Sequence, residues 1–65
     1  MQFFSDMDLP KLIRKENNWV SFQPLDDNVL RLKGVGLVGN TKDSEVMSLI
    51  DAKLELKYYL RDGWK

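Results

Sequence analysis

The segment 34–39 reads Gly-Val-Gly-Leu-Val-Gly and matches the spacing G-x-G-x-x-G. Glycines at this spacing let a backbone loop approach a pyrophosphate group, and they allow a tight turn and close packing of a helix on a strand. A strand-like run precedes the segment at 29–33, and a helix-like run follows it from Ser44. Nucleotide binding through 34–39 is therefore the first chemical hypothesis that the chain raises.

Three features of the chain count against that hypothesis. With 65 residues, the chain is too short for the parallel sheet and crossovers that hold a dinucleotide. Helix-forming residues begin only after Gly39, and Glu55, the acidic residue about 20 positions on, falls inside an element rather than at a strand end. We interpret 34–39 as a glycine-rich strand or bend that another segment approaches closely.

The residue types of common catalytic chemistry are missing. The chain has no cysteine and no histidine, which excludes thiolate and serine–histidine nucleophiles, imidazole ligands and disulfides. Asp26 and Asp27 form an adjacent carboxylate pair, but beside Asn28 they are typical of a solvated turn and supply too few oxygens for Ca²⁺. We therefore predict no catalytic residue, no metal ligand and no cofactor, and we do not expect an enzyme.

Basic residues raise a second binding hypothesis. Cations near the aromatic rings of Trp19 or Phe22 would suit single-stranded nucleic acid, which binds by stacking and by phosphate contact. The balance of ten basic and ten acidic residues counts against this alternative, because phosphate contacts dominate such affinity. The residues that would carry it are Lys11, Arg14, Lys15, Arg31 and Lys33.

Large apolar side chains are abundant for so short a chain. We expect one small domain over 1–65, and a domain of this size buries only roughly 60% of its unfolded surface. Apolar groups left over after the core is filled are expected to contact a partner protein or a second copy. The expected contact residues are Phe3, Phe4, Trp19, Tyr59 and Trp64.

The sequence also allows a prediction of the cellular compartment. No uncharged run is long enough to span a bilayer, so no membrane association is expected. The first residues lack the basic start and the apolar core of a signal peptide. Together with the absence of cysteine, this pattern favours a cytoplasmic protein.

Short segments before the glycines indicate the first half of the fold. The segment 8–15 is expected to be a helix, because its apolar residues share one helical face. Segments 19–23 and 29–33 are rich in aromatic and aliphatic residues, and the turn-forming residues 25–28 join them as a hairpin. Beyond Gly34 the apolar positions change parity, which indicates a bulge or a bend.

The C-terminal half is expected to be one helix from Ser44 to Leu60, because helix formers dominate it. The alternative is a third strand at 53–60, where apolar and charged residues alternate. The expected fold is a small α+β domain, helix–hairpin–helix (αββα), with the C-terminal helix packed on a two-stranded antiparallel sheet. The expected sheet contacts of that helix are Val20, Phe22, Leu30 and Leu32.

Within that helix, a heptad pattern with a polar Lys53 suggests association with another helix. We therefore expect a non-enzymatic protein-interaction module, one form of which would be a homodimeric regulator or inhibitor that occupies a partner's surface. Nucleic-acid binding is the alternative, and nucleotide binding through 34–39 is the third hypothesis. The heptad residues are Val46, Leu49, Lys53, Leu56 and Leu60.

Overall fold

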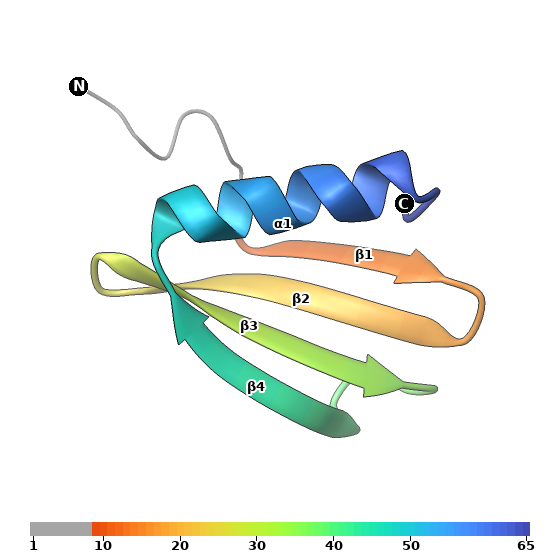
Figure 1. Ribbon diagram of the computed structural model, residues 1–65. Helices are drawn as coiled ribbons and strands as arrows, with labels where there is room; N and C mark the ends of the chain where they lie inside the picture. Colours follow the sequence, from red (N-terminus) through yellow and green to blue (C-terminus); the bar gives the residue numbers. More distant parts are fainter. Residues whose placement is uncertain (1–8) are drawn as a thin grey trace.

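The computed structural model describes residues 9–65, which form four antiparallel strands followed by one helix (Figure 1). Each strand pairs with the next one along the chain, so the sheet order is β1-β2-β3-β4. The expected αββα arrangement on a two-stranded sheet is therefore wrong, and the architecture is ββββα. The elements are β1 (Lys11–Lys15), β2 (Asn18–Leu25), β3 (Asn28–Val35), β4 (Thr41–Met47) and α1 (Leu49–Arg61).

The central hairpin of β2 and β3 confirms the predicted pair of strands. Its register makes even-numbered residues of β2 share a face with odd-numbered residues of β3, so that Phe22 lies opposite Arg31 and Gln23 lies opposite Leu30. The predicted inward position of Leu30 and Leu32 is wrong for this reason. Both leucines project from the face of the sheet away from α1.

The prediction of a helix over 8–15 is also wrong, because Lys11–Lys15 forms β1. This strand pairs antiparallel with β2, and Ile13 lies opposite Val20. Ile13 is buried while its neighbours Leu12 and Arg14 are exposed. So short an apolar run fits a helical and a strand period equally well, and the pairing with β2 decides between them.

The first residues of the predicted C-terminal helix belong instead to β4. This edge strand pairs with β3 and places Glu45 opposite Arg31 and Asp43 opposite Lys33. Opposite charges on directly paired residues stabilise a strand pair. Carboxylates that suit a helix N-terminus in the sequence are therefore the cross-strand partners of two cations.

α1 begins at Leu49 rather than at Ser44, and its course through 61 rules out the alternative strand at 53–60. Ser48 is the N-cap: its side-chain oxygen accepts a hydrogen bond from the backbone N of Asp51 at 3.1 Å. Gly63, with φ of 98°, takes the left-handed conformation that commonly follows a helix end.

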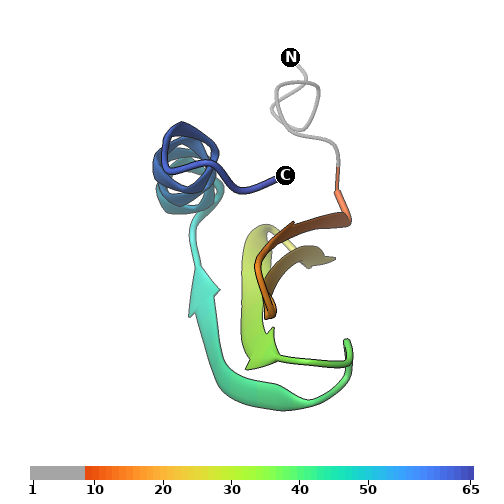
Figure 2. The same ribbon diagram turned by 90° about the vertical axis from the view of Figure 1, so that its right-hand side faces the viewer.

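The core lies between α1 and one face of the sheet (Figure 2). The predicted packing of Val20 and Phe22 toward the helix is confirmed, since both share a buried cluster with Ala52 of α1. The other buried members are Ile13, Val29 and Met47. Partly buried side chains pack against this cluster, namely Leu9, Leu49, Leu56, Tyr59 and Trp64.

After α1 the chain turns back to β1. The rings of Trp64 and Tyr59 meet edge to face with centroids 4.9 Å apart. Lys65 then exchanges two backbone hydrogen bonds with Arg14, of 2.7 Å and 3.0 Å. The end of the described chain therefore pairs with the outer edge of β1.

Candidate interaction surfaces

The outward face of α1 carries a row of exposed apolar side chains. Ile50, Leu54 and Tyr58 follow one another at intervals of four residues, and they are 71%, 51% and 65% exposed. Residues four apart on a helix lie nearly above one another, so these side chains form one continuous row, which we call the helix stripe.

A second apolar face of the same helix is covered by the sheet. Ala52 is fully buried, and Leu49, Leu56 and Tyr59 pack against the core. A helix that is apolar on opposite sides is normally covered on more than one side. Residues 9–65 cover only the side that faces the sheet.

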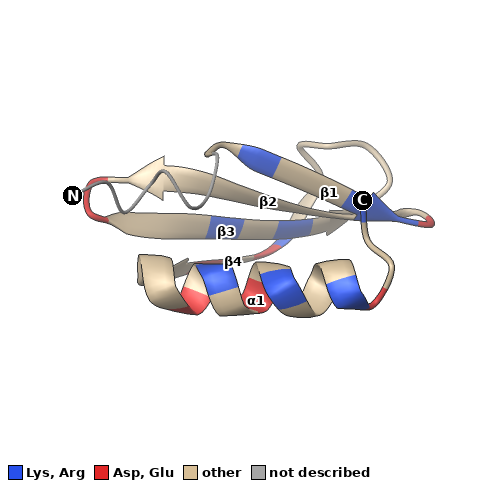
Figure 3. Cartoon of the chain, turned by 90° about the horizontal axis from the view of Figure 1, so that it is seen from above, with Lys and Arg blue, Asp and Glu red and all other residues tan. Residues whose placement is uncertain are grey.

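Basic residues accompany the helix stripe toward the C-terminal end of α1 (Figure 3). Lys57 and Arg61 are exposed and lie on the same outward face. Within residues 9–65, neither side chain forms an ion pair with a carboxylate. Asp51 is the only acidic residue of the first turn of α1. The C-terminal half of the helix stripe is therefore electropositive.

Residues 9–65 leave the face of the sheet that points away from α1 uncovered. Two cross-strand rows run over it, Leu12–Ser21–Leu32–Ser44 and Gln23–Leu30–Val46. Leu12 and Val46 are 46% and 53% exposed, and Leu30 and Leu32 are half-buried. Neither row contains a charged residue. We call the surface formed by these two rows the open sheet face.

The glycine-rich segment borders the open sheet face and buries Trp19 there. The indole of Trp19 packs on Gly34, directly opposite in β3, and its Nε1 donates a hydrogen bond of 3.1 Å to the backbone oxygen of Leu37. A side chain at position 34 would collide with Trp19 and with the backbone of Asn40. The predicted close approach of another segment is therefore confirmed. The pairing of β3 with β4 shifts between Lys33 and Gly34, but the extra residue is Lys42 of β4. β3 itself keeps an unbroken register with β2 through Val35, so the change of parity predicted for it is not found.

The same segment lacks the local structure that a phosphate loop needs. β4 follows it rather than a helix, so no helix N-terminus stands behind the glycines to attract an anion. Gly36 and Gly39 have φ of 81° and 111°, the left-handed conformation of a tight connection. This connection leaves Leu37 84% exposed.

Arg31 is a buried cation that joins β3, β4 and α1. Its guanidinium contacts Glu55 at 2.6 Å, Asp43 at 3.0 Å and Glu45 at 3.2 Å. Burial lowers the pKa of Arg31, but the hydrogen bond and the charge of Glu55, with the charges of Tyr59 and Glu45, outweigh burial, and the net pKa is raised. Arg31 is therefore a structural cation whose charge is already compensated.

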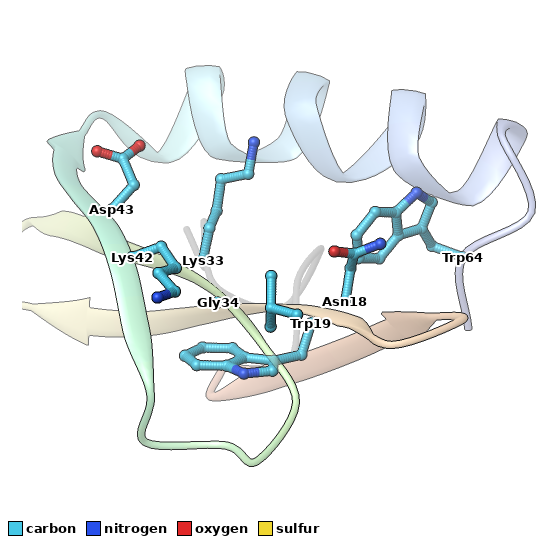
Figure 4. A pocket seen from close by; sticks show the side chains of 8 residues that line it. Asn18, Trp19, Lys33, Gly34, Lys42, Asp43 and Trp64 are labelled. Carbon is cyan, nitrogen blue, oxygen red and sulfur yellow. The ribbon is translucent and has the colours of Figure 1, made fainter.

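A shallow pocket of about 260 Å³ lies at the end of the sheet near Trp64 (Figure 4). Asn18, Lys33 and Asp43 contribute its polar groups. Pockets that enclose small molecules usually have about 300–1,000 Å³, and this one is smaller and open to solvent. It does not point to a small-molecule ligand.

The expected contact residues have different fates. Phe3 and Phe4 lie outside the described residues. Trp19 is 1% exposed and offers no surface to a partner. Tyr59 and Trp64 are half-buried and contact each other and the core, so most of their surface is already used within the chain.

The basic residues of the nucleic-acid hypothesis do not form one surface. Arg14 projects from the face opposite to that of Arg31, and Trp19 lies on the side of Arg14. Lys15 bonds to Asp62 at 3.1 Å, and Lys33 Nζ lies 5.9 Å from the centroid of the Tyr59 ring. Lys11 is half-buried beside Phe22. The residues named in this hypothesis therefore do not form the required combination of exposed cations and exposed aromatic rings.

The sequence reasoning missed the helix stripe. The helix was expected to begin at Ser44, and the heptad pattern assigned the association surface to Leu49, Leu56 and Leu60. Leu49 and Leu56 face the core instead. The useful signal was that the predicted helix is apolar over an arc too wide for one covering surface.

The described part of the chain contains no group of three or more potential ligands placed to hold a metal ion. Nor does it contain a helix with the length and apolar character needed to cross a bilayer. No known protein family, curated protein or solved structure matches the chain. The function of the chain is therefore inferred from its surfaces.

Proposed function

We propose that the protein is a non-enzymatic interaction module that binds a partner protein through the helix stripe. One observation carries the proposal: three large apolar side chains, Ile50, Leu54 and Tyr58, stand exposed in a row on the side of α1 opposite to the side that contacts the core. An amphipathic helix that presents residues at this spacing suits an apolar groove in a partner.

The charges beside the stripe define the chemistry of that partner. Lys57 and Arg61 lie on the same face and have no carboxylate partner within residues 9–65. A groove with an apolar floor and an acidic rim at one end would complement both features. Charges at such a rim mainly accelerate association and set the orientation of binding, while the buried apolar row supplies most of the affinity.

The experiment starts by capturing a partner from the native host with the tagged protein and identifying it by mass spectrometry. The purified partner is then titrated calorimetrically with the wild type and with variants. We expect Leu54→Glu to weaken binding at least tenfold, because it places a charge at the centre of the apolar contact. The double variant Lys57→Glu/Arg61→Glu should weaken binding several-fold at low salt and less at high salt.

Leu12→Glu is the matched control, since Leu12 is similarly exposed but lies on the opposite side of the sheet. It should leave the affinity for the partner unchanged. Equal affinity of the wild type and Leu54→Glu for the purified partner would contradict the proposal.

A further inference from the structure

The open sheet face is a second apolar surface, separate from the helix stripe. Its exposed members Leu12 and Val46 come from the two edge strands, and half-buried Leu30 and Leu32 lie between them. An antiparallel sheet can leave one face in water, but that face is then usually polar. Here the two central rows combine leucine and valine with serine and glutamine, and they hold no charge.

We propose that a second copy of this chain covers the open sheet face, so that two sheets pack face to face. The surface suits a copy of itself because a two-fold axis brings the residues that lie close to it near their own equivalents. A charged residue near the axis would then meet a like charge, and the two central rows contain none. Gln23 Nε2 donates a hydrogen bond of 3.3 Å to Ser21 Oγ, so these two polar groups of the face are already paired with each other.

The available area approaches that of a modest dimer. Strands lie about 4.8 Å apart and rise about 3.3 Å per residue, so the two rows measure roughly 250 Å² in projection. Covering them on both copies would remove roughly 500–800 Å² of accessible surface, so residues that border the rows must also be covered to reach about 1,000 Å², the lower limit of a specific interface. Leu37, which is 84% exposed in the glycine-rich segment beside the face, would add to that area.

The charges at the two ends of the sheet favour one orientation. Asp26 and Asp27 form the turn between β2 and β3 at one end. Arg14 and Lys42 lie at the other end, where they outnumber Glu16. A two-fold axis in the plane of the interface and perpendicular to the strands would set the acidic end of each copy over the basic end of the other. This antiparallel arrangement pairs opposite charges twice.

The helix stripe is not used in this arrangement. α1 lies on the other side of each sheet (Figure 2), so both stripes of the dimer would face outward. Self-association and partner binding are therefore independent properties of two faces. A purified chain tests the first without any knowledge of the partner.

The test is sedimentation equilibrium of the purified full chain over a concentration range of about 5–500 µM. We expect the wild type to shift from monomer to dimer within this range. Leu12→Glu and Val46→Glu should each weaken dimerisation at least tenfold, and both sites are exposed enough to accept the charge in a folded monomer. Circular dichroism and thermal unfolding verify that each variant is folded. Leu54→Glu on the helix stripe is the matched control and should dimerise as the wild type does.

A charge exchange tests the orientation. Asp27→Lys alone and Arg14→Glu alone should each weaken dimerisation several-fold, and the double variant should restore it to within about threefold of the wild type. Failure of the double variant to restore it would overturn the antiparallel arrangement. A wild type that stays monomeric throughout the range, or a dimer lost in Leu54→Glu but kept in Leu12→Glu, would overturn the use of this face.

Discussion

The indole of Trp19 packs directly on the backbone of Gly34, its cross-strand neighbour in β3. A β-carbon at position 34 would lie well under 3.0 Å from two indole carbons and from the backbone oxygen of Asn40. The first glycine of the G-x-G-x-x-G spacing is thus needed to bury a tryptophan. Its role is one of packing, which requires no bound ligand.

Gly34→Ala should therefore destabilise the fold strongly, by about 3 kcal/mol, the upper range for overpacking a filled site. Gly36→Ala is the matched comparison, because position 36 has open space and only its φ of 81° opposes a side chain. We expect Gly36→Ala to lower the free energy of unfolding by roughly 1–2 kcal/mol. Urea unfolding followed by tryptophan fluorescence measures both.

The same contact can be isolated by a double-mutant cycle. Phenylalanine at position 19 lacks the far ring of the indole, so Gly34→Ala should cost less in a Trp19→Phe background than in the wild type. Part of the cost should remain, because the backbone oxygen of Asn40 is still close. Strict additivity of the two substitutions would contradict the assigned role of Gly34.

Arg31 provides the second prediction. Glu55 is its closest and least exposed partner, whereas Asp43 and Glu45 are largely exposed. Glu55→Gln should therefore cost about 1–2 kcal/mol of stability, in the range of a hydrogen bond to a charged group. Asp43→Asn and Glu45→Gln should each cost less than about 1 kcal/mol, because solvent screens exposed pairs. Urea unfolding at low salt measures how much stability each of the three variants loses. Equal losses would show that Glu55 contributes no more than Asp43 and Glu45.

Because the pKa of Arg31 is raised, its contribution to folding stability should not change with pH near neutrality. A basic group whose pKa is higher in the folded state than in the unfolded state stabilises the fold fully at pH values below the unfolded-state pKa. This stabilisation is lost only as the pH rises through the folded-state pKa. Both values lie far above neutrality. The difference in unfolding free energy between the wild type and Arg31→Met should therefore stay constant between about pH 6 and pH 9. A drift of more than about 0.5 kcal/mol would show that another titrating group is coupled to Arg31.

The sequence predicted the secondary structure correctly where the preferences of neighbouring residues alone determine it. The hairpin of β2 and β3 could be predicted because aromatic and aliphatic runs flank a strong turn at 25–28. β1 and β4 could not be recognised, because pairing with a neighbouring strand overrides the weak helical preference of such short segments. In β4, Asp43 and Glu45 had a plausible alternative role at a helix N-terminus.

The candidate surfaces depended on the register, which the sequence did not specify. Assigning Leu30 and Leu32 to the core was natural, since a buried arginine is rare unless it is paired. The ion pairs that allow Arg31 to be buried include Asp43 and Glu45 of β4, whose strand was not predicted, and Glu55 of α1, which was predicted as helical but not as a partner of Arg31. Once the register is known, the two leucines belong to the open sheet face and Arg31 belongs to the interior.

Ser48 yields a prediction about where α1 begins. Its side-chain oxygen accepts a hydrogen bond from the backbone N of Asp51 at 3.1 Å. Ser48→Ala should cost about 1 kcal/mol, and Ser48→Asp should keep the cap and its stability. Thermal unfolding measures both substitutions. Equal stability of the wild type and Ser48→Ala would show that Ser48 does not cap the helix and that α1 does not begin at Leu49.

The return of the chain end to β1 gives the last prediction. Trp64 contacts Tyr59 with ring centroids 4.9 Å apart, and Lys65 then forms two backbone hydrogen bonds with Arg14. Trp64→Ala should release this pairing, because the ring anchors the two final residues to the core. We expect the Arg14 amide to exchange with solvent at least tenfold faster, which corresponds to about 1.4 kcal/mol. The amide of Val20 in the buried centre of β2 should be affected much less.

Lys65→Ala is the control for this last measurement, since Lys65 bonds to Arg14 through its backbone alone. It should leave exchange at Arg14 unchanged. If Trp64→Ala also leaves that amide protected, the pairing with Lys65 does not depend on the aromatic contact, and the edge of β1 is held by its own backbone hydrogen bonds. If both amides exchange faster by the same factor, the substitution has lowered global stability, and the chain end is then part of the cooperative core.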